Sequence, residues 1–506
     1  MDHMPQAYQE LVQELQSIAV LRSCASVLSW DEQTYLPPEA AEYRAEQLSL
    51  LAGMSHDRAT SPKIGEWLEQ LTDESALGES DSVAAANVRE AKRGYERSTK
   101  LPKRLVEELS RVGTLSQQAW ITARKNDDYE TFKPWLTKMI ALKREEAAAL
   151  GSESGLAYDA LLDDYEPGAT TEIVSQAFQQ LREQLVELVA AIRDSGVEPQ
   201  HEILTRRYPI ETQRILGLRA AKAIGFSFES GRLDVSAHPM CCTLGPRDCR
   251  LTTRYDEKHF PGAFFGTLHE AGHGIYEQGL DSSAYGLASG EACSLGIHES
   301  QSRMWENLVG RSMAFWEHFY PETQQLFPEA LSDVDLTTFY AAINDVRPSW
   351  IRVEADEVTY NLHIMLRFEI EQALIAGDLS AEELPDVWNK TFYSYFGMTP
   401  PTHALGCLQD VHWSIGLFGY FPTYALGNMY ASQIFQQAGA ELGDLPTMFS
   451  KGEFAPLKEW LNKNVHAHGR CYRAPQLVEK ITGTPFSAEP LVNHLRSKFG
   501  PLYGLG

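Results

Sequence analysis

Apolar residues recur at helical spacing through most of the first 195 positions of this chain. Within residues 8–32 they fall three or four positions apart, at Leu11, Leu15, Ile18 and Leu21. The same period returns over residues 98–124, 129–150 and 171–194, and such spacing gives a helix one apolar face. Pro102 and Pro209 stand where the first turn of a helix accepts proline. The pattern predicts an almost entirely helical N-terminal part over residues 1–195.

Between residues 225 and 256 the pattern changes to short alternating segments, around 233–237 and 249–254. Turn-forming Gly, Pro and Asp residues separate these segments, so we expect a small antiparallel β-sheet here. From Pro261 the helical period returns almost to the end, and no flexible linker or internal repeat interrupts it. We therefore expect a mainly α fold and one domain over residues 1–506, with the sheet and the candidate site in the part 196–506.

Composition narrows the class of partner. The chain has 44 basic and 69 acidic side chains, a net charge of −25, which argues against nucleic acid as a partner. No apolar run approaches the roughly 20 residues of a bilayer span, and the N-terminus lacks the features of a signal peptide. Seven cysteines, an odd number without CxxC spacing, indicate reduced thiols. We expect a cytoplasmic protein with no membrane partner.

The stretch "FGTLHEAGHGIYEQG" contains the first candidate chemistry. His269 and His273 lie four positions apart, so on a helix both rings reach the same point, as in the HExxH motif of zinc peptidases. An apolar stripe supports that helix, at Phe264, Leu268, Ala271 and Ile275. The alternative is that the two histidines are hydrogen-bonded core residues and Glu270 is a solvated neighbour.

A catalytic zinc needs a third protein ligand and an open position for water. Our choice is Glu299, which follows His273 by 26 positions in another helical stretch. Its neighbour His298 competes for this place, but it would point about 100 degrees away on a helix. Glu270 would then take a proton from the zinc-bound water and pass it to the leaving group. The motif thus predicts metal-assisted amide hydrolysis with Zn²⁺, although Co²⁺ or Mn²⁺ can occupy such sites.

Six ordered motifs carry a resemblance that covers essentially the whole chain. They are "HPM" at 238–240, "DCRLT" at 248–252, "HEAGH" at 269–273, "HESQ" at 298–301, "IRVEAD" at 351–356 and "GCLQDVHW" at 406–413. In order and spacing they resemble the carboxypeptidase Taq family of zinc metallocarboxypeptidases, except that Met240 stands where the family usually has Phe.

This resemblance implies a saddle-like, almost all-helical fold with a small sheet and a deep groove with the metal at its floor. It also implies a homodimer with one zinc ion per subunit. The implied activity is removal of single C-terminal residues, with broad preference, from peptides with a free C-terminus. By motif, His269, His273 and Glu299 match the metal ligands, and Glu270 matches the catalytic glutamate.

An exopeptidase must also bind the free carboxylate of its substrate, and arginine does this best because its planar fork can donate two hydrogen bonds. Arg352 in "IRVEAD" is the first candidate and Arg250 in "DCRLT" the second. The alternative for either residue is a structural ion pair, with Asp356 or Asp248 respectively. Asp248 is itself a further candidate for the substrate-binding set.

The developing oxyanion of the reaction needs a donor beside the metal. His412, Tyr420 and Tyr424 are candidates, with Tyr424 preferred as catalytic and Tyr420 as substrate-binding, and Asp410 could orient one of the histidines. Aromatic residues at this density also commonly form core. His238, before a proline at a likely strand end, is expected to help close one end of the groove.

Three other functions stay open on the residues alone. A related helical zinc oligoendopeptidase or dipeptidyl carboxypeptidase would share HExxH and the distant Glu, and a nonpeptide amidohydrolase would share the chemistry. A peptide-binding protein without catalysis would be expected to have lost Glu270 or a ligand, and the chain has kept all of them.

Overall fold

The computed structural model describes residues 4–72, 77, 79 and 82–505. Its N-terminal part consists of helices, whose ends follow local chemistry. The side chain of Thr170 caps one of them, and Gly196 ends the same helix in the left-handed conformation that glycine favours. These helices are α1 (Gln6–Thr34), α2 (Ala41–Ala59), α3 (Pro62–Gln70), α4 (Val83–Lys100), α5 (Lys103–Asn126), α6 (Tyr129–Leu150), α7 (Ala157–Tyr165) and α8 (Thr171–Ser195).

After α9 (Ile210–Ala223) the chain forms the one sheet of the described residues, from β1 (Gly231–Val235), β2 (Cys241–Gly245) and β3 (Asp248–Thr253). The strand order is β1-β3-β2. β2 pairs with β3 antiparallel, but β1 pairs with β3 parallel. The expectation of an antiparallel sheet was therefore wrong for one of its two pairings, because the chain places β2 on the far side of β3.

Helices return from α10 (Phe260–Gly279) onward, as the sequence predicted. The next are α11 (Leu295–Arg303), the π-helix η6 (Met304–Val309), α12 (Met313–Leu326), α13 (Pro328–Leu331), α14 (Leu336–Ile343), the short helix η7 (Arg352–Glu354), α15 (Tyr360–Ala376) and α16 (Leu384–Phe396). The last are the short helix η8 (His412–Ile415), α17 (Pro422–Leu442), α18 (Leu445–Ser450), α19 (Ala455–Asn464), α20 (Ala474–Thr482) and α21 (Glu489–Leu502).

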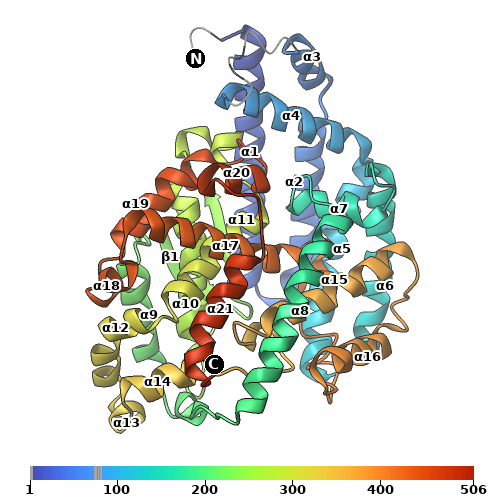
Figure 1. The fold of residues 1–506 in the computed structure, drawn as a ribbon. Helices are drawn as coiled ribbons and strands as arrows, with labels where there is room; N and C mark the ends of the chain where they lie inside the picture. Colours follow the sequence, from blue (N-terminus) through green and yellow to red (C-terminus); the bar gives the residue numbers. More distant parts are fainter. Residues whose placement is uncertain (1–3, 73–76, 78, 80–81, 506) are drawn as a thin grey trace.

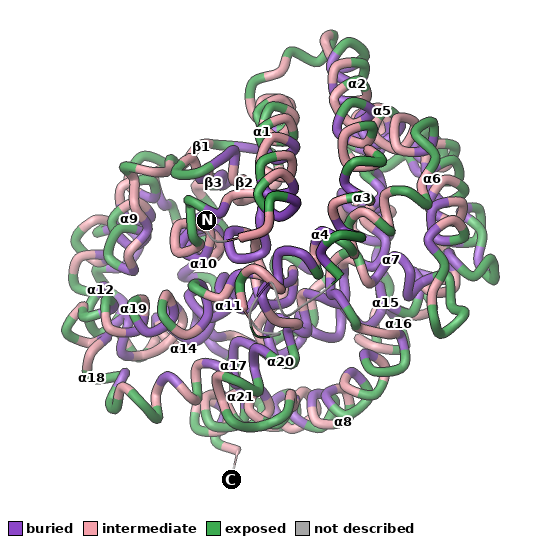
Figure 2. Tube along the Cα trace, turned by 90° about the horizontal axis from the view of Figure 1, so that it is seen from above, coloured by how far each residue is buried: buried purple, intermediate pink, exposed green. Residues whose placement is uncertain are grey.

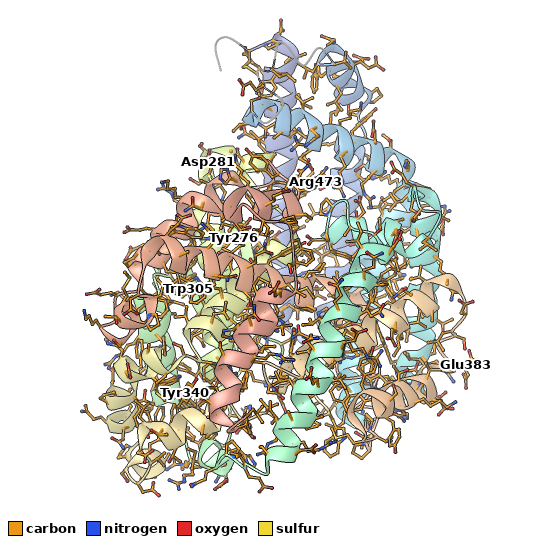
Figure 3. All side chains as sticks on the ribbon, viewed as in Figure 1. Tyr276, Asp281, Trp305, Tyr340, Glu383 and Arg473 are labelled. Carbon is orange, nitrogen blue, oxygen red and sulfur yellow. The ribbon has the colours of Figure 1, made fainter. Side chains whose placement is uncertain are left out.

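These elements form one large helical body. Figure 1 shows α1 and α2 rising above the rest, with α3 and α4 near their upper ends. Figure 2 shows buried residues gathered around α10, α11 and α17 in the middle and exposed residues on outer helices such as α8. Tyr276 and Trp305, both fully buried, lie on the side of the body opposite the edge where Glu383 lies (Figure 3). No helix of the described residues is long and apolar enough to span a bilayer.

Polar contacts join the N-terminal helices to the elements that follow the sheet. Trp120 of α5 donates from Nε1 to the carbonyl of Leu408 at 2.9 Å. Glu166, just after α7, accepts from the backbone N–H of Gly296 in α11 at 3.0 Å. These buried bonds favour one domain over residues 1–506, which stays a prediction.

A cavity of about 560 Å³ lies between α1, α2 and α5. Ile415 of η8 closes part of its wall, so the cavity borders the segment that contains His412. His269, His273 and Glu299 do not line it. The cavity is therefore separate from the candidate metal ligands.

Candidate metal centre and active site

Two turns of α10 and one turn of α11 direct three side chains at a common point. The ligand atoms of His269, His273 and Glu299 all lie within 4.8 Å of one another. Glu299 Oε2 is 3.5 Å from His269 Nε2 and 3.3 Å from His273 Nε2. Two imidazole nitrogens and one carboxylate oxygen suit a divalent transition metal and leave a further position open. The three residues therefore fit a metal ion.

The charge states of His273 and Glu299 suit ligation as well. Burial alone would lower the pKa of His269, but the charge of Glu299 and the hydrogen bond with Glu306 raise it above its ordinary value. Burial lowers the pKa of His273 to about 3, and the neighbouring His298 lowers it further, so this imidazole is neutral at physiological pH. Burial alone would raise the pKa of Glu299, but His269 and Arg303 lower it below its ordinary value. Because metal ligands must be deprotonated, a neutral imidazole and an ionised carboxylate are the required forms.

Glu306 orients one histidine from outside this cluster. His269 Nδ1 donates to Glu306 Oε2 at 2.8 Å, which holds the proton on Nδ1 and leaves Nε2 free for a metal. Burial opposes ionisation, yet Arg303 and His269 lower the pKa of Glu306 to about 2. Glu306 lies in η6, directly after α11, and single π-helical turns are frequent at functional sites. The sequence signal was available, because Glu306 follows Glu299 by seven positions on a helical stretch.

We expect Glu306→Gln to weaken metal binding about 10- to 100-fold, the range found when an outer partner of a histidine ligand is changed. The amide keeps the volume of the side chain but removes the charge that fixes the imidazole. Competition with a metal-sensitive dye measures the dissociation constant directly. Glu317→Gln, at an exposed position of α12, is the matched control and should leave the constant unchanged. Equal constants for wild type and Glu306→Gln would contradict the orienting role.

Glycines let the helices of the site approach closely. A Cβ atom built on Gly272 of α10 would lie 2.6 Å from the Cα of Ser302 in α11. One built on Gly427 of α17 would lie 2.6 Å from Cγ of Glu299. Since real Cβ contacts are longer, neither position accepts a larger residue without a shift of its helix. Glycine at these two positions thus permits the packing that holds Glu299 in place.

Gly427→Ala should displace Glu299 and therefore lower both stability and metal affinity. Inserting a methyl group into a filled contact costs about 1–3 kcal/mol of unfolding free energy. Thermal unfolding with and without added metal measures both effects. Gly439→Ala on the same helix is the control, because its Cβ would meet only Leu445 Cδ1 at 3.7 Å, an ordinary contact. A Gly427→Ala protein as stable as the Gly439→Ala protein would show that the helices adjust freely.

Glu270 lies between the two histidines of α10 and is 6% exposed. Burial raises the pKa of its carboxyl group to about 7, and the Glu299 charge raises it further against the opposing effect of His269. Among the described residues no side chain donates a hydrogen bond to it. A carboxylate that is near the histidines, without a partner and titrating near neutrality can exchange a proton at a working pH.

His298, the competing candidate for the third ligand, lies outside the cluster. Its Nε2 donates to Glu277 Oε1 at 2.8 Å, and its ring stacks on His273 with the centroids 4.4 Å apart. The structure therefore directs Glu299 rather than His298 at His269 and His273.

The three candidate oxyanion donors lie together. His412 Nε2 and Tyr424 Oη are hydrogen-bonded at 2.8 Å, and the Tyr420 and Tyr424 rings are 5.3 Å apart. Tyr424 precedes Gly427 by three positions on α17, so both lie on the helix face that packs on Glu299. Burial, and then the charge of Glu299, raises the pKa of Tyr420, so its hydroxyl stays protonated. The three side chains that the sequence suggested as oxyanion donors therefore lie together.

Arg352 is buried, with 2% of its surface exposed, and all three of its nitrogens are engaged. Nε and Nη2 donate to Asp410 Oδ1 at 2.9 and 2.8 Å, and Nη1 donates to Tyr360 at 2.8 Å. The other Asp410 oxygen accepts from Nε of the buried Arg367 at 2.7 Å. Asp410 therefore serves two arginines, and it lies 4.0 Å from His412 Nδ1, beyond hydrogen-bond distance.

The remaining candidates lie on and beside the sheet. Arg250 donates two hydrogen bonds to Asp248, each 2.9 Å long, and its guanidinium lies 4.4 Å from the ring centre of Trp30 in α1. This pair joins the sheet to α1. His238 lies in the turn between β1 and β2, with its ring centroid 6.2 Å from that of His412. The structure thus brings His238 close to His412, one of the candidate oxyanion donors, and places Arg250 with Asp248 in an ion pair.

Comparisons with known proteins agree with this geometry. The model of the carboxypeptidase Taq (M32) metallopeptidase family matches residues 10–499. The chain is 46% identical to Thermostable carboxypeptidase 1 of Thermus thermophilus over 506 residues, covering 98% of this chain and 99% of that protein. It is 38% identical to Carboxypeptidase 1 of Bacillus subtilis, with 97% of each chain covered. The crystal structure of the M32 carboxypeptidase from Deinococcus radiodurans superposes with a TM-score of 0.90 at 38% identity, covering 99% of this chain and 100% of that one.

Proposed function

The chain belongs to the carboxypeptidase Taq (M32) metallopeptidase family, and we propose on that basis that it removes single C-terminal residues from peptides with broad side-chain preference. It is a metallocarboxypeptidase, as its relatives are. The observation that carries the proposed chemistry is the buried carboxylate of Glu270 beside three convergent ligand atoms. We infer that the metal is Zn²⁺, one per subunit, with Co²⁺ or Mn²⁺ as substitutes, because two imidazoles and one carboxylate suit this ion.

In this proposal His269, His273 and Glu299 hold the ion, and Glu306 keeps His269 in the ligating tautomer. The ion, when bound, would acidify a water molecule and polarise the scissile carbonyl group. Glu270 accepts the proton of the nucleophile on its carboxylate and returns it to the nitrogen of the leaving residue. Its pKa near 7 in the absence of metal supports both transfers.

Tyr424 and His412 are the proposed donors to the oxyanion. Burial, and then the charge of Arg352, lowers the pKa of His412 far below its ordinary value. The ring is therefore neutral and supports the tyrosine hydroxyl by their hydrogen bond of 2.8 Å. A neutral donor held in place before the reaction can stabilise developing charge without reorganisation. Tyr420 and His238 would line the path of the substrate beside them.

The test is a time course on a short peptide with a free C-terminus, analysed by mass spectrometry. Stepwise loss of single C-terminal residues, with an intact C-terminally amidated peptide, is the expected result. Loss of dipeptides would support the dipeptidyl carboxypeptidase, and internal cuts would support the oligoendopeptidase. No cleavage by metal-loaded protein would favour a binding protein. Peptides that vary only in the last residue measure its preference.

Two further properties belong to the proposal. The family resemblance supports a homodimer, which sedimentation velocity would reveal as a species of twice the chain mass. Seven cysteines without a disulfide support a reducing compartment such as the cytoplasm, which cell fractionation tests.

A further inference from the structure

Two arginines near His238 have no anionic partner of their own. Arg124 and Arg254 form no hydrogen bond or ion pair with any described residue. The guanidinium of Arg124 only faces the ring of Trp120, 5.5 Å from its centre. Arg124 is half-buried and Arg254 is exposed. Both guanidinium groups are therefore available to an anionic ligand.

Helix geometry brings Arg124 to the segment that contains the oxyanion donors. Gly113 and Gln117 of α5 line the cavity between α1, α2 and α5, and Arg124 follows Gln117 by seven positions, on the same helix face. Trp120, between them, donates to the carbonyl of Leu408 at 2.9 Å. This face of α5 therefore runs from the cavity to the segment with Asp410 and His412.

The sheet brings Arg254 to the same place. Arg254 directly follows β3, where the Thr253 carbonyl accepts from the N–H of Ser236 at 3.1 Å. Ser236 Oγ in turn donates to the carbonyl of His238 at 2.6 Å. The end of β3 is thus tied to the turn that places the His238 ring 6.2 Å from that of His412.

Charge around His238 is unbalanced. Burial, and then the charges of Arg352, Arg124 and Arg254 against that of Asp410, together lower the pKa of His238 to about 4. Both Asp410 oxygens already accept from Arg352 and Arg367. Glu354, whose carboxylate also acts on Arg124, is exposed. One half-buried and one exposed guanidinium group, neither paired with an anion, are suited to bind one.

We propose that Arg124 and Arg254 together bind the terminal carboxylate of the peptide substrate, beside His238. This assignment rests on the proposed function, since only an exopeptidase needs such a subsite. It replaces the roles predicted for Arg352 and Arg250. All three nitrogens of Arg352 are taken by Asp410 and Tyr360, and Arg250 is taken by Asp248 and Trp30.

The experiment compares one pentapeptide as free acid and as C-terminal amide, with metal-loaded wild type, Arg124→Met, Arg254→Met and Arg124→Lys. Each methionine variant should lower kcat/KM on the free acid about 10- to 100-fold, the effect of losing a hydrogen bond to a charged group. The slow rate on the amide should not change. Arg124→Lys keeps the positive charge but not the planar guanidinium group that can donate two hydrogen bonds. Its kcat/KM on the free acid should therefore lie between those of wild type and Arg124→Met.

Arg111→Met, at an exposed position of the same helix, and Arg250→Met are the controls and should keep the wild-type preference for the free acid. Metal content and thermal unfolding show that each variant is folded. If either Arg124→Met or Arg254→Met keeps that preference, or if Arg250→Met loses it, the assignment is wrong while the carboxypeptidase remains. If wild type itself cleaves the amide as fast as the acid, the proposed function fails and the assignment fails with it.

Discussion

Replacement of Glu270 by glutamine should lower kcat/KM about 10²- to 10⁴-fold, the contribution of a general acid–base group, without loss of the metal. Glutamine fills the same volume but cannot accept a proton. It leaves the ligand atoms of the neighbouring His269 and His273 in place. Steady-state kinetics on the free-acid peptide, together with metal analysis of the same sample, measures both quantities. Glu270→Asp keeps a carboxylic acid on a shorter side chain. Its kcat/KM should therefore lie between those of wild type and Glu270→Gln.

The same substitution should change stability in the metal-free protein with a definite sign. Burial holds the pKa of Glu270 at about 7 in the folded state, against an ordinary value of 4.5. Between these values the unfolded chain loses its proton and the folded chain keeps it, so wild type loses stability as pH rises from about 4.5 to 7. The Glu270→Gln variant has no such loss. Its stability relative to wild type should therefore increase as pH rises over that range. A constant difference in unfolding midpoint from pH 5 to pH 8 would contradict the buried, unpartnered environment of Glu270.

Removal of the metal is the second change with a large expected effect. A chelator should reduce activity to background, and Zn²⁺, Co²⁺ or Mn²⁺ should restore it. Glu299→Gln should weaken metal binding by about 10³-fold or more, because losing one of three ligands exceeds the 10- to 100-fold effect of an outer partner. The amide oxygen of glutamine can still accept from Arg303 Nε, and its NH2 group can donate to the Ser302 hydroxyl, which now donates to Glu299, so the variant should fold.

His298→Gln is the decisive comparison for Glu299. The two positions are adjacent, both were candidates for the third ligand, and glutamine can still donate to Glu277 in place of His298. Equilibrium dialysis should find one metal per chain in His298→Gln and much less in Glu299→Gln at the same free metal concentration. The reverse result would move the third ligand to His298.

The helices were predictable because their signals are local. The helix predicted over 129–150 is α6, whose start is capped by the Asp128 side chain and whose end meets Gly151. The direction of the sheet was not predictable, since alternation of apolar residues is the same in parallel and antiparallel strands. Residues 236–247, which separate β1 from β3, contain β2 itself and allow the parallel pairing.

In the candidate site, too, some residues were predictable from local sequence signals and others were not. His269 and His273 follow from spacing on one helix, and Glu299 was chosen by chain distance and charge; the structure brings the three together. Glu306 was missed although its spacing of seven from Glu299 was visible, and the arginines that we propose for the carboxylate, Arg124 and Arg254, carry no signal of their own in the sequence. Glu306 acts through its hydrogen bond with His269, and Asp410, a nearby acid, is paired with Arg352 and Arg367 and not with the two proposed arginines. A single sequence does not state which acid pairs with which arginine.

The close contacts at Gly272 and Gly427 also bear on how the enzyme survives a period without its ion. Because α10 and α11 meet nearly backbone to backbone and α17 presses on Glu299, the ligands are held by packing rather than by the metal. Enzyme stored after dialysis against chelator should regain its activity as fast as the ion diffuses in, with no refolding phase. The metal ion can then dissociate and rebind without unfolding. The concentration of free metal ion, rather than refolding, determines which fraction of the protein is active.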